Sequence, residues 1–167
     1  KEDKSMVTLA DAESEEVIKK IISDNFPEHS IIGEETDAVE KKGPYTWYID
    51  PIDGSRNFAH KIPFFAVSIS LLHKGDILVG VVYNPVTNYL FYVEKGKGAY
   101  LNDKKIQVSK GKQEKCIVTV AAGRGSEYTG VKRNLLYGLP PNVVSSVRDF
   151  GCTALNVAFV AAGSTEA

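Results

Sequence analysis

Residues 46–55, Thr-Trp-Tyr-Ile-Asp-Pro-Ile-Asp-Gly-Ser, decide the fold expected for this chain of 167 residues. The first four residues form a short apolar run of strand type, which we expect to stop at Asp50-Pro51. Pro51 fixes the local backbone and Gly54 permits a sharp bend, so Asp50 and its neighbour Asp53 share one tight turn. Two such carboxylates repel each other unless a cation lies between them, and oxygen ligands suit Mg²⁺ or Mn²⁺. A simple Asx-type turn explains the same spacing equally well.

Short strand-like runs joined by tight turns follow this stretch. Phe65 to Leu72 and Ile77 to Tyr83 form a hairpin through Lys74-Gly75-Asp76. The next expected strands are Tyr89 to Val93, Ala99 to Leu101 and Ile106 to Val108. Because parallel neighbours need long crossovers, this succession predicts an antiparallel sheet.

Helices are expected at both ends of the chain. Thr8 to Asn25 carries an apolar stripe at helical spacing, and Thr8 with Asp11 makes a capping pattern at its start. Thr36 to Pro44 is polar and predicts a surface loop. Near the other end, the expected elements are two strands and a helix that is buried nearly all round and stops at Gly163: Ile117 to Ala121, Val143 to Val147, and Thr153 to Ala162.

Composition narrows the class of protein. The chain is 43% hydrophobic and its net charge is −1, which argues against a large cationic surface for nucleic acid. The two cysteines, Cys116 and Cys152, are too few for a disulfide scaffold and fit a reducing compartment. Since no apolar run approaches about 18 residues, we expect no membrane span. We therefore expect a cytoplasmic domain of the α/β or α+β class.

Three acidic motifs follow one another along the chain. They are Thr8-x-x-Asp11, Gly33-Glu34-Glu35, and Trp47-x-x-Asp50-Pro51-Ile52-Asp53-Gly54-Ser55-x-Asn57-Phe58. With these motifs the chain resembles the inositol monophosphatase family of magnesium-dependent, lithium-sensitive phosphatases, and the resemblance continues to the segment Ala161-Ala162-Gly163. It implies a layered α-β-α-β-α sandwich whose first half is an antiparallel sheet with helices.

The resemblance also implies a metal site. Glu34, Asp50 and Asp53 would be ligands of two or three Mg²⁺ ions, with Mn²⁺ as a substitute, and the Ile52 carbonyl would add a further oxygen. Glu35 would support the site. Glu34 would count as catalytic, because it would hold the ion that carries the attacking water.

Further residues would act on water and substrate. Ser55, where the family usually has Thr, would orient the water, and Asp11 would accept a hydrogen bond from it. Asp53, Gly54 and Ser55 would contact the substrate phosphate. Gly151-Cys152-Thr153 opens the last helix and would line the substrate pocket, although a helix start needing only a Thr153 cap explains this segment equally well.

Several alternatives stay open. The favoured substrate is inositol monophosphate, while 3′-phosphoadenosine 5′-phosphate, fructose 1,6-bisphosphate and histidinol phosphate belong to the same class. A different hypothesis is a non-catalytic relative that binds a protein or an RNA. We expect a homodimer, a small-molecule phosphate monoester as partner, and neither membrane nor nucleic acid. We also expect residues 1–167 to form a family domain incomplete at both ends, since the Trp-Asp-x-Ala-Ala-Gly motif that closes the family pattern does not occur before Ala167.

Overall fold

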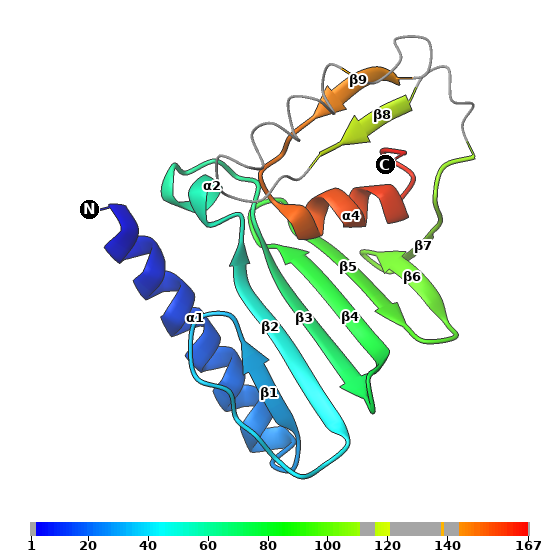
Figure 1. Ribbon diagram of the computed structural model, residues 1–167. Coiled ribbons are helices and arrows are strands. Elements are labelled where there is room, and N and C mark those ends of the chain that lie inside the picture. Colours follow the sequence, from blue (N-terminus) through cyan, green and yellow to red (C-terminus); the bar gives the residue numbers. More distant parts are fainter. Residues whose placement is uncertain (1–2, 111–115, 121–137, 139–143, 167) are drawn as a thin grey trace.

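The structure is a computed structural model that describes residues 3–110, 116–120, 138 and 144–166 (Figure 1). Its elements, in chain order, are α1 (Asp3–Asn25), β1 (Ser30–Gly33), β2 (Tyr45–Asp53), α2 (Ser55–Ala59), β3 (Ala66–His73), β4 (Asp76–Asn84), β5 (Tyr89–Glu94), β6 (Gly98–Leu101), β7 (Lys104–Ile106), β8 (Cys116–Thr119), β9 (Val144–Arg148) and α4 (Thr153–Ala161). No helix in the described part of the chain is long and apolar enough to cross a membrane.

A seven-stranded sheet in the order β1-β2-β3-β4-β5-β6-β7 forms the body of the molecule. The predicted antiparallel pairing is confirmed from β2 to β7. The sequence analysis missed β1, which pairs parallel to β2 with Ile31 opposite Trp47. The predicted loop at residues 36–44 connects the two strands, and it is tied back through a bridge between Ile31 and Val39.

Three predicted boundaries are wrong. Helix α1 begins at Asp3, so Thr8 and Asp11 lie inside it and do not cap it. Strand β2 runs on to Asp53 instead of stopping at Asp50-Pro51. Its pairing with β3 is irregular between Asp50 and Asp53, which is the kind of position where a strand accommodates proline. Strand β7 ends at Ile106, where the predicted strand began.

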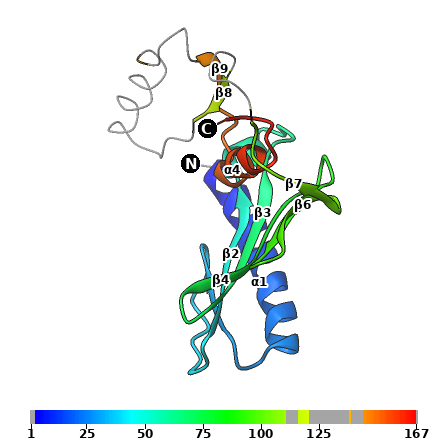
Figure 2. The same cartoon turned by 90° about the vertical axis from the view of Figure 1, so that its right-hand side faces the viewer.

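Residues 121 and 143, at the edges of two other predicted strands, lie outside the described residues. The remaining parts of those strands correspond to β8 and β9, which pair parallel to each other. Figure 2 shows this pair beyond α4, at one end of the large sheet.

The two long helices cover opposite faces of the sheet. Ile22 of α1 packs with Ile31 and Ile49, whereas Leu155 and Ala158 of α4 pack with Ala66 and Phe91. Ile49 lies opposite Ile69 across the β2–β3 pair, and Ala66 has the other side-chain parity along β3. On its far side α4 reaches the second sheet, where Asn156 Nδ2 donates to the Val120 carbonyl at 3.3 Å. Helix, sheet, helix and sheet therefore follow one another, in agreement with the predicted layered α/β sandwich.

Helix α4 is not buried all round. Leu155, Asn156 and Ala158 are buried, but Val157 is 65% exposed, so the expectation of a helix buried all round is wrong for the described residues. Its predicted end is confirmed, because Gly163 has φ 70° and its amide donates to the Val160 carbonyl at 3.0 Å.

Candidate functional site

The ends of β1 and β2 bring two acidic segments together. Gly33, the last residue of β1, lies beside Ile49 in the parallel register, so Glu34 follows β1 next to Asp50 of β2. A hollow of about 300 Å³ opens there, lined by Glu34, Asp50 and residues of three neighbouring strands, among them Ser68 and Ser70 of β3. By side-chain parity Asp50 faces the side of the sheet that α4 covers.

The charges in this hollow act on one another. Burial, followed by the negative charges of Glu34 and Asp53, raises the pKa of Asp50 to about 7. The Ile52 amide donates to the Asp50 carboxylate, which opposes the shift. The Asx-type contact is therefore present, and it coexists with a cluster of carboxylates that a cation would stabilise.

The donor set fits a hard divalent ion. Among residues 3–110, 116–120, 138 and 144–166, no group of three His, Cys, Asp or Glu side chains already forms a metal cage. Glu34, Asp50 and Asp53 nevertheless interact electrostatically, and all three offer only oxygen. Oxygen ligands with flexible side chains suit Mg²⁺ and Mn²⁺ better than zinc.

Asp53 makes a structural contact that the sequence did not indicate. Its Oδ2 accepts hydrogen bonds from the Ala154 amide and, at 3.3 Å, from the Cys152 thiol. Cys152 is the N-cap residue of α4 but its side chain makes no capping hydrogen bond, so the Thr153-cap alternative is wrong. A carboxylate at this position stabilises the helix start.

The Cys152 side chain is not set up as a nucleophile. Burial raises the pKa of its thiol, and the nearby charges of Asp53 and Asp50 raise it further. The reactive form of cysteine is the thiolate, which this environment disfavours. Cys152 is 1% exposed, whereas Gly151 and Thr153 on either side are exposed.

Two glycine turns bring the predicted substrate-binding residues into contact. Gly54, the residue after β2, has φ 94°, and a Cβ there would lie 3.2 Å from Cys152 Cβ and 3.3 Å from the Gly151 oxygen. Asn57 holds this arrangement, because its Nδ2 donates to the carbonyls of Phe64 and Phe150, at 2.7 Å in each case. The structure therefore places Gly54 next to Gly151 and Cys152, although 97 to 98 residues separate them in the sequence.

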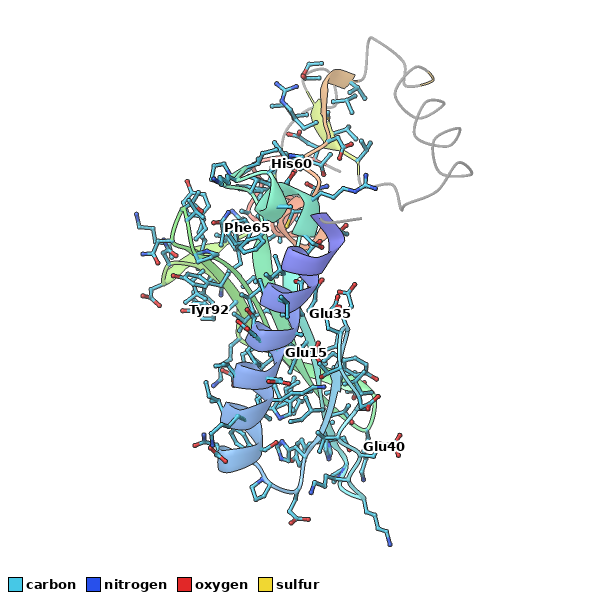
Figure 3. All side chains as sticks on the ribbon, turned by 90° about the vertical axis from the view of Figure 1, so that its left-hand side faces the viewer. Glu15, Glu35, Glu40, His60, Phe65 and Tyr92 are labelled. Atoms are coloured by element: carbon cyan, nitrogen blue, oxygen red, sulfur yellow. The ribbon has the colours of Figure 1, made fainter. Side chains whose placement is uncertain are left out.

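Asp11 and Ser55 come from two helices that pack against each other, α1 and α2. Asp11 is only 4% exposed, and Ser55 is the first residue of α2. Glu35 exposes its side chain, while its backbone amide is held by a residue that the sequence analysis missed, Glu15 of α1 (Figure 3). The signal for Glu15 was its place four residues after Asp11, on the same helix face.

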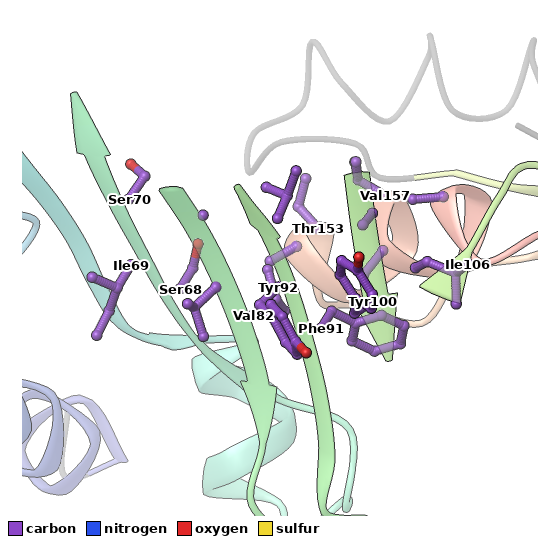
Figure 4. Close-up of a pocket in the computed structure, with 17 residues that line it drawn as sticks. Ser68, Ile69, Ser70, Val82, Phe91, Tyr92, Tyr100, Ile106, Thr153 and Val157 are labelled. Atoms are coloured by element: carbon purple, nitrogen blue, oxygen red, sulfur yellow. The ribbon is translucent and has the colours of Figure 1, made fainter. Parts of the chain in front are cut away.

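A second hollow lies between α4 and strands β3 to β7 (Figure 4). Its volume is about 360 Å³, and the described residues that line it, such as Val82, Phe91 and Val157, carry no charge. Ser68 and Ser70 line both hollows. This apolar space does not suit a phosphate group, so the hollow with Glu34 and Asp50 is the candidate site.

These features define a class: a layered α/β sandwich with oxygen donors gathered where β1 and β2 end. The family model for the inositol monophosphatase family matches residues 1–167. Inositol-1-monophosphatase of Caulobacter vibrioides is 39% identical over 166 residues, covering 96% of this chain and 64% of that protein. Nus factor SuhB of Pasteurella multocida is 37% identical over 164 residues, covering 96% of this chain and 61% of that protein.

A solved structure agrees with these sequence comparisons. The inositol monophosphatase from Anabaena (Nostoc) superposes with a TM-score of 0.86 at 36% identity, covering 96% of this chain and 65% of that one. The chain belongs to the inositol monophosphatase family, a family of phosphatases. It spans between 61% and 65% of the length of these relatives.

Proposed function

We propose that this protein is a Mg²⁺-dependent phosphomonoesterase that acts on inositol monophosphate or a closely related sugar phosphate. The observation that carries the proposal is the shared hollow of Glu34 and Asp50, where burial and neighbouring carboxylates raise the pKa of Asp50 to about 7. Repulsion between clustered carboxylates destabilises the fold if the cluster has no function, whereas a cation site requires such a cluster.

The metal ligands of the proposal are Glu34, Asp50, Asp53 and the carbonyl oxygen of Ile52. Two or three Mg²⁺ ions, or Mn²⁺ in their place, would supply a bound water of lowered pKa and neutralise charge on the phosphate and the leaving alkoxide. Asp53 already uses Oδ2 on α4, which leaves Oδ1 for this purpose. Glu35 supports the ligand segment through its backbone amide.

Other residues of the chain orient water and substrate in this proposal. The Ser55 hydroxyl lies at the start of α2, beside α1, and orients the attacking water. Asp11 accepts a hydrogen bond from the Ser55 hydroxyl, which fixes the direction of that hydroxyl. Gly54 and Ser55 direct their amides toward the phosphate. The segment Gly151 to Thr153 lines the sugar side of the pocket, which its contact with Gly54 supports.

The proposal also covers the partner, the oligomeric state and the cellular location. We infer a small-molecule phosphate monoester as partner, a homodimer, and a cytoplasmic location. Cys116 and Cys152 are both free thiols, which supports a reducing compartment.

The test is phosphate release by the full-length protein, with a panel of phosphomonoesters and increasing Mg²⁺. Asp50→Asn should abolish release, whereas Asp76→Asn, an exposed carboxylate of β4 that pairs with Lys95, should leave it unchanged. If none of the substrates released phosphate at any millimolar Mg²⁺ concentration, the enzyme proposal would be rejected. If Ser55→Ala kept full turnover while Asp50→Asn lost it, the role of Ser55 on the water would be wrong.

The likeness to a Nus factor supports a second candidate, a binding function for a protein or RNA partner. The two candidates predict different variant effects. Asp50→Asn should leave partner binding intact if the partner docks elsewhere on the fold, and it should abolish phosphate release if the hollow is catalytic.

A further inference from the structure

Glu15 is a buried carboxylate that the proposed reaction does not use. Its side chain lies on α1 and is 0% exposed. Buried carboxylates are rare unless donors satisfy them, and here four donors do so. Lys19 Nζ approaches Oε1 to 2.8 Å, the Thr36 amide and hydroxyl donate to the same oxygen, and the Glu35 amide donates to Oε2 at 2.9 Å.

These contacts bracket Glu34 from both sides. Both donor amides belong to the residues that follow Glu34, namely Glu35 and Thr36. On the preceding side, a Cβ on Gly33 would lie only 2.0 Å from the Glu15 carboxylate oxygen. Only glycine leaves room for the carboxylate there, so Glu15 touches the backbone before and after Glu34.

Lys19 also holds the backbone of this segment, as far as Asp37. Its Nζ donates to the Asp37 carbonyl at 2.8 Å and to the Thr36 carbonyl at 3.3 Å. It also balances the charge of Glu15, one turn earlier on the same helix. With its charge paired and its oxygens hydrogen-bonded, Glu15 is suited to hold backbone and not to bind a cation.

We propose that Glu15, paired with Lys19, is the positioning residue of the metal site: it fixes the backbone around Glu34 and thereby sets the Glu34 carboxylate against Asp50. This inference rests on the proposed function, in which Glu34 and Asp50 are ligands. The structure supports it because β1 ends at Gly33 and α1 reaches the ligand segment from the face of the sheet opposite Asp50. Partners of metal ligands typically contribute 10- to 100-fold to metal affinity.

The experiment measures Mn²⁺ affinity by calorimetry and by the electron paramagnetic resonance of free Mn²⁺, with thermal unfolding recorded for every variant. Glu15→Gln keeps the shape of the side chain and removes its charge. Glu16→Gln is the matched control, because Glu16 is the next residue of the same helix and is exposed. Gly33→Ala is a second variant, since the added methyl group would occupy the space of the Glu15 carboxylate and displace it.

Glu15→Gln and Gly33→Ala should each weaken Mn²⁺ binding about 10- to 100-fold while the protein stays folded, and the control should bind as the wild type does. The double variant should lose little more than either single one, because both act on the same backbone segment. In the full-length enzyme, Glu15→Gln should raise the Mg²⁺ concentration for half-maximal activity more than it changes the KM for substrate.

Two outcomes separate the two proposals. Wild-type Mn²⁺ affinity in folded Glu15→Gln would overturn the positioning role while leaving the proposed function intact. A wild-type protein that binds no Mn²⁺ would reject the proposed metal site itself, and the positioning role with it. If Glu15→Gln does not fold, Gly33→Ala decides by the same two criteria.

Discussion

Acid should destabilise this protein in part through one carboxyl group, Glu15. Burial raises the pKa of Glu15, but hydrogen bonds from Lys19, Thr36 and the Glu35 amide outweigh it and lower the pKa from its usual 4.5 to about 2. One pKa unit corresponds to about 1.4 kcal/mol, so the shift stabilises the folded state at neutral pH by about 3 kcal/mol.

The sign follows from the folded-state pKa lying below the unfolded-state value. The unfolded chain takes up a proton at Glu15 first, so the contribution is fully present above about pH 4.5 and is lost as the pH falls toward about 2. Urea unfolding at several pH values across this window measures it. Trp47 is the only tryptophan and reports unfolding through its fluorescence.

Glu15→Gln should be less stable than the wild type near neutral pH and should lose less stability on acidification. The two unfolding free energies should converge by about 3 kcal/mol across the window. Glu16→Gln should follow the wild-type curve, because this side chain is exposed on the same helix. If Glu15→Gln kept the pH dependence of the wild type, the hydrogen bonds to Glu15 would not lower its pKa and the reasoning would be refuted.

Three further variants test other contacts of the structure. Asp53→Ala removes the acceptor of the Ala154 amide and should lower the free energy of urea unfolding by about 1–2 kcal/mol; an unchanged midpoint would show that α4 does not depend on this cap. His29→Leu removes the acceptor of the Trp47 indole N–H and should cost about 1 kcal/mol with a shift in tryptophan emission, and a wild-type spectrum would contradict the contact. Asp50→Asn should raise the melting temperature in a chelator, because it removes repulsion from two acidic neighbours, and a lower melting temperature would argue against that repulsion.

The sheet from β3 to β7 could be predicted because its signals are local. Alternating apolar residues and turn residues such as Gly75 and Asn102 lie next to each other in the sequence, and consecutive strands pair as neighbours. Strand β1 could not be found in this way. It contains only Ser30 to Gly33, and it is a strand because it pairs with β2, sixteen residues further along the chain.

The boundary errors have a similar cause. The Thr8-to-Asp11 pattern is a good capping signal in isolation, but a helix that continues upstream overrides it. The Asp50-Pro51 pair is a good stop signal, but an irregularity in the pairing with β3 absorbs the proline and lets β2 reach Asp53. Local propensity set both expected ends, and the pairing with β3 moved the end of β2.

For the candidate site, the proposed ligand residues could be named from their motifs, but the contacts that hold them could not. Glu15 lies 20 residues before Glu35, and Asp53 lies 101 residues before Ala154. No periodicity or spacing rule connects residues at such separations. They are paired because two helices meet the sheet edge from opposite faces.

These two long-range contacts connect the candidate site to both helices. Glu15 holds the backbone that follows Glu34 from the α1 side, and Asp53 joins the segment of the other proposed ligands to the start of α4. Asp53 therefore divides its two oxygens between a helix cap and the proposed cation, so a change in the position of α4 must change the direction of a ligand. The helix start also carries Gly151 and Cys152, which touch Gly54. In this arrangement the proposed substrate-lining segment and the proposed metal site cannot move independently, and a phosphate bound between them would be held by both.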